Sequence, residues 1–311
     1  MAGVRVVALR RVAAGLAALV VGLTLTACDD GRTRLVVRTE LPEEARDQVE
    51  DAFEEANPDV DLRFSVRDDS ETAPELQGDA EVAYDVWWGG PSSSLEELTR
   101  AGRLAGWTPW ASSPFVVVFD RDSVGLVSAP QDWIDVLHHG WFEEVLLTDP
   151  TQARSGAAFV LGAVAESTRT EGESYIGFEW LGRLDNQVVR YVDDAEEAVR
   201  GVRMGVASLA IVPLASFETS RGDDETLHFR RLPSRTAELP AGVGLIRRDG
   251  SESDAAARFV AFVTSRQSDE VTLPVGWEEP SEWQRDDVTM VVDSASVWVT
   301  RWRETVRGRG K

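Results

Sequence analysis

The segment Trp88-Gly89-Gly90-Pro91-Ser92-Ser93 combines residues that suit the binding of a small anion. Two consecutive glycines let the backbone approach a bound molecule closely, and the Ser92 and Ser93 hydroxyls supply hydrogen-bonding groups. A predicted helix begins here, and the first turn of a helix has unpaired N–H groups and a partial positive charge. The same residues are also what an ordinary tight turn and helix cap require.

A second segment with similar chemistry runs from Thr151 to Gly156. It also precedes a predicted helix, and its candidate ligand-binding residues are Thr151, Arg154, Ser155 and Gly156. Hydroxyls, a guanidinium and helix N–H groups together favour an oxyanion or a carboxylate.

Two further places carry carboxylates or hydroxyls at the ends of predicted strands. Asp193 and Asp194 follow one strand, and they suit either ligand contact or a plain helix cap. Thr39 and Glu40 end the first strand. Loops at the carboxyl ends of strands in an open α/β sheet surround its binding crevice, so Thr39, Glu40 and Asp193 are also candidates.

Composition argues against nucleic-acid binding and against catalysis. The chain has 32 Lys and Arg against 54 Asp and Glu, a formal charge of −22, whereas a phosphate backbone needs clustered basic residues. One Cys and no His/Cys cluster exclude a typical zinc site. His138 and His139 offer a base, but there is no Gly-x-Ser-x-Gly nucleophile elbow. We expect no catalytic residue, metal site or cofactor.

Hydrophobic periodicity predicts an α/β fold in which strands and helices alternate. Ser94 and Glu97 predict a capping box at the second helix. The predicted strands cover residues 35–37, 60–66, 84–87, 115–119, 145–147, 188–192, 209–212, 227–232 and 243–246. The predicted helices cover residues 42–56, 94–101, 132–137, 155–165, 175–184, 195–202 and 253–262. The last thirty residues are Trp-rich and show no clear pattern.

The first 27 residues are typical of an export signal. A basic start precedes the apolar run from Val12 to Leu25, which is shorter than the roughly 20 residues needed to span a bilayer. The sequence Leu25-Thr26-Ala27-Cys28 resembles the bacterial lipobox, which implies cleavage before Cys28 and lipid attachment to its sulfur. The alternative is an ordinary signal peptide with an incidental Cys. Cleavage leaves residues 28–32 as a linker and a charge of about −25.

Several motifs resemble, in order, the extracytoplasmic solute-binding proteins of ABC importers, in the branch of ferric-iron, thiamine, polyamine and phosphonate binders. Asp149 to Gly156 is similar to the family's Asp-Pro-x-x-Ser-Gly turn. The resemblance covers about residues 35–270, and its other motifs are Tyr84–Pro91, Phe178–Leu181, Val192–Val199, Gly205–Pro213 and Ala255–Ser265.

The resemblance implies a periplasmic-binding-protein fold of type 2, with two lobes that close over a ligand by hinge motion. Mapped onto this chain, lobe one would hold residues 33–117 and 235–311, and lobe two residues 118–234. The crossovers would lie near residues 115–120 and 232–238. Trp87 and Trp88 are adjacent on a strand and point to opposite faces, so we predict that Trp88 lines the cleft and Trp87 packs in the core.

Two departures from the family bear on the ligand. Ferric-binding members use adjacent tyrosines late in the second lobe, but Val212 to Ser216 contains none. The stretch from Trp107 to Phe115 is also short for the family. Its shortness fits a wider cleft, a different ligand, or loss of transport.

The function implied is capture of a small polar solute and its delivery to an ABC permease, by a monomer held to the membrane through lipid on Cys28. A structural or sensory lipoprotein that keeps the fold without transport is the alternative. Hydroxyls, helix N-termini and Arg154 favour an oxyanion, a carboxylate or a metal–anion complex. The net negative charge favours cations, but it is screened beyond about 8 Å at physiological salt.

Overall fold

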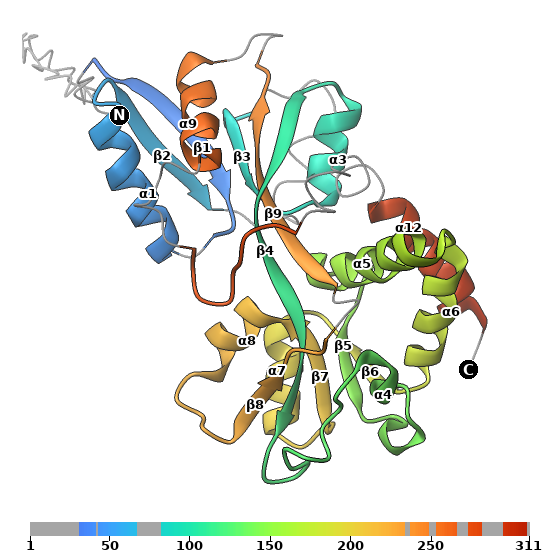
Figure 1. Cartoon of the computed structure of the whole chain (residues 1–311). Coiled ribbons are helices and arrows are strands. Elements are labelled where there is room, and N and C mark those ends of the chain that lie inside the picture. The colour runs from blue at the N-terminus through green and yellow to red at the C-terminus, as the bar shows by residue number, and fades with distance from the viewer. Residues whose placement is uncertain are drawn as a thin grey trace, which may run out of the picture.

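The computed structural model describes residues 31–41, 43–66, 82–233, 237–248, 253–265, 273–281 and 295–309. The predicted export signal, Cys28 and the polar stretch 67–81 lie outside these ranges. Helices and strands form two α/β lobes, one above the other in Figure 1. Within the described residues, no helix has the length and apolar character needed to cross a membrane.

The first lobe is built on a sheet with the strand order β2-β1-β3-β9-β4. Parallel pairing joins β1 to β2 and to β3, while β9 runs antiparallel to β3 and β4. Its strands are β1 (Thr33–Thr39), β2 (Val60–Val66), β3 (Val86–Gly89), β9 (Glu238–Ile246) and the first part of β4 (Leu104–Asp120).

Helices cover both faces of this sheet because successive strand residues point to opposite sides. On one face, α1 (Glu43–Ala56) and α9 (Asp254–Thr264) meet at Phe53 and Phe259, whose ring centroids are 5.2 Å apart. On the other face, α3 (Ser93–Arg100) packs against Trp87. Ser92 caps α3, since its hydroxyl accepts from the Leu95 N–H, so the predicted cap at Ser94 lies two residues too late.

The second lobe has a sheet in which β4 lies between β7 and β8, and β5 joins β7 to β6. Its other strands are β5 (Val145–Thr148), β6 (Val188–Val192), β7 (Leu209–Pro213) and β8 (Leu227–Arg230). One face is covered by α4 (Trp133–Val136), α5 (Arg154–Glu171) and α6 (Ser174–Asp185), and the other by α7 (Ala195–Arg203) and α8 (Leu214–Arg221). Short 3-10 turns lie at His139–Trp141 and Arg307–Arg309.

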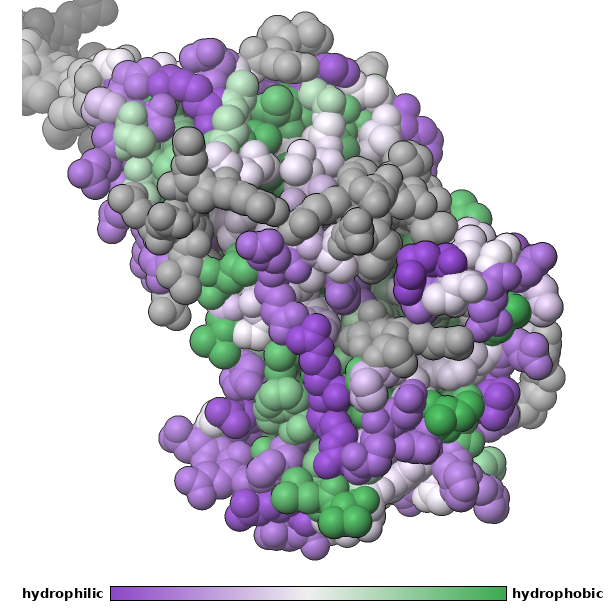
Figure 2. Space-filling model, viewed as in Figure 1, coloured by the Kyte–Doolittle hydropathy of each residue, from purple (hydrophilic) through white to green (hydrophobic). Residues whose placement is uncertain are grey.

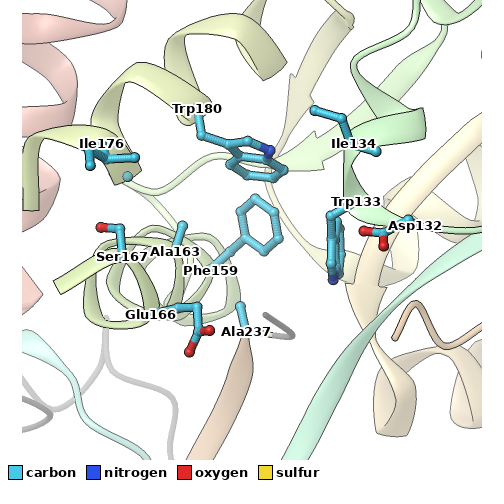
Figure 3. A pocket seen from close by; sticks show the side chains of 11 residues that line it. Asp132, Trp133, Ile134, Phe159, Ala163, Glu166, Ser167, Ile176, Trp180 and Ala237 are labelled. Carbon is cyan, nitrogen blue, oxygen red and sulfur yellow. The ribbon is translucent and has the colours of Figure 1, made fainter. Parts of the chain in front are cut away.

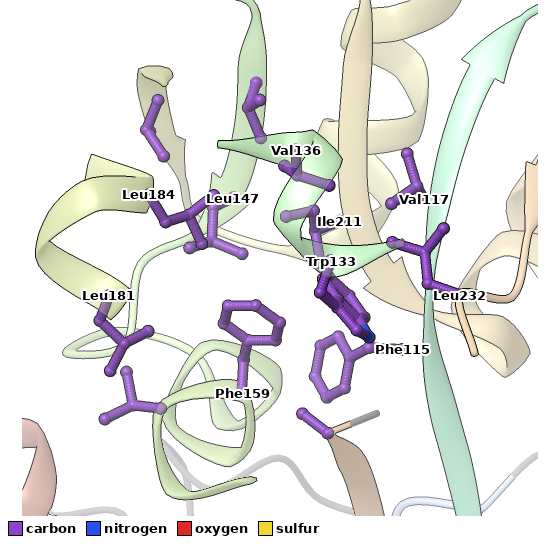
Figure 4. Packing of buried hydrophobic residues seen from close by; sticks show 14 of the residues in the cluster. Phe115, Val117, Trp133, Val136, Leu147, Phe159, Leu181, Leu184, Ile211 and Leu232 are labelled. Carbon is purple, nitrogen blue, oxygen red and sulfur yellow. The ribbon is translucent and has the colours of Figure 1, made fainter. Parts of the chain in front are cut away.

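Alternation along β4 separates two apolar cores in this lobe. Phe115 and Val117 face α4 and α5, where Phe159 and Trp133 complete a buried cluster (Figure 4). Val116 and the residues of its face point toward α7 and α8. The whole stretch from Phe115 to Phe119 is therefore buried, as expected for a strand covered on both faces.

The two lobes are joined where β4 passes from one sheet to the other. It pairs with β9 as far as Pro114 and with β7 from Phe115 onward, at the start of the range predicted for the first crossover. The stretch from Trp107 to Phe115 is thus continuous strand. At the same point the Ser113 hydroxyl accepts from the Ala215 N–H at 2.9 Å, which ties β4 to α8.

The helix nearest the carboxyl end of the chain differs from the sequence-based division of the lobes. We predicted that residues 235–311 belong to lobe one, and β9 and α9 do lie there. However, α12 (Ala295–Thr305) packs on α5 and α6, and Trp302 is buried in the core of the second lobe. Its first turn still touches the first lobe, because the Ser296 N–H donates to the Glu96 carboxylate of α3 at 2.8 Å.

Glu238, which begins β9 at the crossover, should make stability depend on pH. Burial raises the pKa of this carboxyl above its ordinary value of 4.5, and the neighbouring Ser281, Ser112 and Arg231 only partly oppose the shift. The folded state then holds this proton more tightly than the unfolded state, so its contribution to stability falls as the pH rises above 4.5.

We therefore expect Glu238→Gln to be more stable than the wild type at neutral pH, with the difference vanishing well below pH 4.5. Urea unfolding at a series of pH values measures this. The exposed Glu55→Gln on α1 is the matched control for the loss of one carboxylate charge. A Glu238→Gln difference that is constant with pH would contradict the assignment.

Candidate functional site

A buried arginine, Arg38, lies one residue before the end of β1, and sequence reasoning did not name it as a site residue. Arg38 is in register with Trp87 of β3, so the two side chains share one face of the sheet. The guanidinium carbon lies 3.8 Å from the centroid of the Trp87 ring, and the arginine side chain has no exposed surface. A cation stacked on an indole face and removed from water is held more strongly than one at the surface.

Glu40 connects this arginine to the opposite lobe. Arg38 Nη2 donates to Glu40 Oε1 at 2.6 Å, and Arg154 Nη1 donates to Glu40 Oε2. Arg154 is the first residue of α5, in the second lobe, whereas Arg38 and Glu40 belong to the first. One carboxylate therefore bridges two guanidinium groups across the junction of the lobes.

Glycines at the end of β3 make room for both arginines. A Cβ on Gly90 would lie 2.8 Å from Arg154 Nη1 and 2.7 Å from the Pro240 carbonyl oxygen, closer than real contacts allow. A Cβ on Gly89 would lie 3.3 Å from Arg38 Nη1. The sequence argument that Gly89 and Gly90 permit close approach holds, although here the approaching group is a guanidinium of the protein itself.

The cluster retains hydrogen-bonding capacity for a ligand. Arg38 Nε and Nη1 are buried and have no hydrogen-bond partner among the described residues. A buried donor without a partner costs free energy, and a guanidinium presents its donors in a planar fork that matches carboxylate and phosphate oxygens. Two arginines and one glutamate leave a local excess of positive charge. The arrangement therefore suits an anionic group.

The other predicted site residues of the first lobe have local structural roles. The Thr39 hydroxyl is buried and accepts from the Leu41 N–H at 3.1 Å. Ser92 caps α3, as described above. Ser93 begins α3, but its side chain lies outside the part of the structure that is described.

Trp88 differs from its predicted place. It is fully buried and packs in the core of the first lobe against Trp110 and Phe259, with ring centroids 5.1 and 5.8 Å away. Trp87 is the tryptophan that contacts the arginine cluster, and its Nε1–H donates to the Gly90 carbonyl at 3.3 Å. The β1–β3 register determines which of the two tryptophans lies beside Arg38. The sequence of β3 alone does not specify this register.

In the second lobe, Thr151 forms a turn with Asp149, which accepts from both its N–H and its hydroxyl at 2.7 Å. Ser155 is partly buried in the first turn of α5. Gly156 permits tight packing, since a Cβ there would lie 2.5 Å from the Thr148 carbonyl oxygen. Asp193 is exposed, and its N–H donates to Glu197 at 3.3 Å.

The three tyrosines lie in different environments and are not adjacent in the sequence. Tyr84 is buried in the first lobe, Tyr175 is exposed on α6, and the Tyr191 hydroxyl donates to Asp185 at 2.8 Å. No group of three or more His, Cys, Asp and Glu residues within the described ranges is arranged to hold a metal ion.

Comparison with known proteins agrees with this architecture. Residues 36–277 match the family model described as bacterial extracellular solute-binding protein. The chain belongs to this family. A comparison with curated protein sequences gives no significant match. Family membership assigns the binding of a solute outside the cytoplasm, and binding rather than catalysis.

Solved structures of the same fold include three informative neighbours. A periplasmic binding protein of Actinobacillus pleuropneumoniae, AfuA, with exogenous fructose-6-phosphate bound, has a TM-score of 0.63 at 15% identity. Iron-bound HitA of Pseudomonas aeruginosa has a TM-score of 0.64 at 16% identity. A Trichodesmium protein (IdiA, FutA) in complex with iron and citrate has a TM-score of 0.67 at 10% identity. Each alignment covers 88% of this chain and 99% of the other. The fold is thus that of type 2 periplasmic binding proteins.

Gly90→Ala tests whether the glycine loop must admit Arg154. The new methyl group would collide with the Pro240 carbonyl, which cannot move easily, and with the Arg154 guanidinium. We expect a loss of about 1–3 kcal/mol in the free energy of unfolding, as is typical of overpacking. Urea denaturation measures it. Gly106→Ala on β4 is the control, because a Cβ there meets nothing within 4 Å. Equal stability of the two variants would contradict the role of Gly90.

Proposed function

We propose that this solute-binding protein is a lipoprotein that captures a small anionic solute between its lobes and delivers it to an ABC permease. The observation that supports the ligand class best is the buried guanidinium of Arg38, which lies beside the interlobe bridge of Glu40 and Arg154. Two of its nitrogens have no hydrogen-bond partner among the residues that the structure describes. The solute would be an oxyanion, a carboxylate or a metal–anion complex.

Glu40 acts in this proposal as an internal counter-ion. Without a ligand its carboxylate neutralises the facing guanidinium groups, which would otherwise repel each other at close range. A bound anion accepts from Arg38 Nε and Nη1 and shares Arg154 with Glu40. Because Arg154 comes from the second lobe, an anion that engages both arginines binds the closed arrangement more tightly than the open one. Such differential affinity is what shifts a two-state equilibrium toward closure.

The left outline of the molecule steps inward between the two lobes (Figure 2). Hydrophilic residues predominate on the visible face of the lower lobe, as expected for a chain with a formal charge of −22. Long-range repulsion of an anion by that charge is screened by salt, whereas hydrogen bonds from two guanidinium groups act at contact.

The neighbours support an anionic solute without identifying it. Fructose-6-phosphate and citrate, named for AfuA and for the Trichodesmium protein, both carry anionic oxygens. HitA and the Trichodesmium protein are described with iron. Since Val212 to Ser216 has no tyrosine, iron would reach this site as a complex whose anion contacts Arg38 and Arg154.

Arg154→Ala is the direct test of the ligand site. A thermal-shift panel of phosphate, phosphonates, sugar phosphates, citrate, ferric citrate, thiamine and polyamines is run on the mature chain after removal of prior ligand by unfolding and refolding. A ligand at a hundred times its dissociation constant stabilises the protein by about 2.7 kcal/mol, or several degrees. We expect an anion to give this shift and Arg154→Ala to weaken its binding about thirtyfold or more, because a charged hydrogen-bonded contact is lost.

Arg183→Ala on the exposed face of α6 is the matched control and should bind like the wild type. The anion should also reduce the radius of gyration in solution scattering. A flat panel on folded protein would contradict transport of these solutes and favour a structural or sensory lipoprotein. If Arg154→Ala leaves the affinity for the anion unchanged, the ligand binds at another site.

Lipid attachment is tested by Cys28→Ser in cells. If the lipobox sulfur carries the anchor, the variant should move from the membrane fraction to the soluble extracytoplasmic fraction, because stable anchoring requires the acyl chains. Immunoblots of separated fractions measure this, and a variant that stays in the membrane fraction would contradict the anchor. Loss of anchoring should leave solute binding by the mature chain unchanged.

A further inference from the structure

A cavity of about 270 Å³ lies in the second lobe, between α4, α5 and α6. Its walls include Trp133 of α4, Phe159 of α5 and Trp180 of α6, with Ala237 of the second crossover at one end (Figure 3). An apolar cavity of about 150 Å³ is large enough for benzene, so this one has room for an organic molecule of up to about ten non-hydrogen atoms.

Three aromatic rings form one side of the cavity. Their centroids are 5.9 to 6.1 Å apart, and the Trp133 and Trp180 planes are nearly perpendicular at 82°. Trp180 keeps part of its surface exposed. Ring faces carry negative partial charge and attract a cation placed within about 6 Å of the centroid, and tryptophan attracts it most strongly.

The charged residues of the wall have one sign. Asp132 and Glu166 line the cavity, and none of its lining residues in the described structure is Lys or Arg. Arg169 donates to both carboxylate oxygens of Glu166, at 2.8 to 3.1 Å. The Arg169 side chain is 60% exposed and the Glu166 side chain 17%, so water screens the guanidinium more than the carboxylate, and Glu166 keeps part of its negative potential at the cavity.

The indole of Trp133 is an independent observation that points to a ligand. Its side chain is 4% exposed and lines the cavity, yet its Nε1–H has no hydrogen-bond partner within the described residues. A buried indole N–H normally finds an acceptor. A ligand with a hydroxyl or ether oxygen would satisfy it.

We propose that this cavity binds a small organic cation, specifically a quaternary ammonium group carrying a hydroxyl or ether oxygen. The ammonium would lie against the aromatic rings near Glu166 and Asp132, and the oxygen would accept from Trp133 Nε1. Aromatic walls and carboxylates without a basic residue favour a cation over an anion of the same size.

The site is distinct from the arginine cluster between the lobes. Glu166 is twelve residues beyond Arg154 on α5, which corresponds to about 18 Å along the helix axis. The two sites also have opposite charge preferences, since one presents guanidinium groups and the other carboxylates. A cation bound in the second lobe would therefore be a second ligand and not the solute of the interlobe site.

The test compares choline with its neutral isostere 3,3-dimethylbutan-1-ol by titration calorimetry on the mature wild-type protein. The two molecules have the same shape and hydroxyl group, so only the charge differs. We expect choline to bind at least about tenfold more tightly, the range of a desolvated cation–π contact. Equal affinities, or no choline binding at millimolar concentration, would overturn the proposal.

Two variants locate the binding. Glu166→Gln should weaken choline binding about fivefold, because it removes a negative charge and keeps the size of the side chain. Trp180→Leu should weaken choline binding about tenfold, because it removes the negative face of the indole and keeps an apolar side chain. Glu179→Gln, on the exposed face of α6, is the matched control and should match the wild type. If Trp180→Leu fails to fold by circular dichroism, Glu166→Gln and the isostere pair still decide. Choline binding lost in Arg154→Ala but kept in Glu166→Gln would assign it to the interlobe site and overturn the proposal.

Discussion

One strand takes part in both sheets, and the positions of the remaining elements follow from where it changes partner. β4 pairs with β9 up to Pro114 and with β7 from Phe115. The strand therefore passes from one lobe to the other between these two consecutive residues. The return crossover is held close to it, because Leu232 and Ala237 are both buried in the second core. Two neighbouring connections between the lobes define a single hinge axis. The loops at the strand ends of the two lobes face each other across this axis. Arg38, Glu40 and Arg154 meet for this reason.

The arginine cluster would cost free energy of folding if its role were only structural. Removing a guanidinium from water costs several kcal/mol, and a buried ion pair often contributes little net stability. Arg38 recovers part of this cost from Glu40 and the face of Trp87, but two of its nitrogens remain unpartnered in the described structure. Binding explains such an arrangement better than folding does, since an apolar residue beside Trp87 would stabilise the sheet without the cost. The family match is consistent with this argument, because a solute-binding protein must keep unsatisfied polar groups where its ligand will lie.

The sequence was sufficient for much of the fold. The bounds of β2 and β6 agree with the predicted strands, and the two-lobed architecture agrees with the ordered family motifs. Arg38 was missed because the candidates of the first strand were its last residues, Thr39 and Glu40, and this arginine lies one residue before the end of β1. Its position among Val36, Val37 and Thr39 in a buried strand was the available signal. Pairing with Trp87 depends on register between strands 49 residues apart, which local patterns do not contain.

The place of α12 shows the same limit and bears on how the lobes move. Trp298, Trp302 and Val306 recur every four residues, a helical stripe visible in the sequence, but nothing local says which lobe it covers. In the structure Trp302 packs edge-on against Tyr191 at 5.4 Å, and Trp298 lies 5.9 Å from Phe178, so the stripe is buried in the second lobe. The hydrogen bond from Ser296 to Glu96 of the first lobe is a much smaller attachment. Because apolar burial outweighs one such bond, α12 must travel with α5 and α6 when the lobes separate. The carboxylate of Glu96, which accepts from the first turn of α12, then loses a helix N-terminus as its partner, and this loss favours the closed arrangement together with the bridge at Glu40.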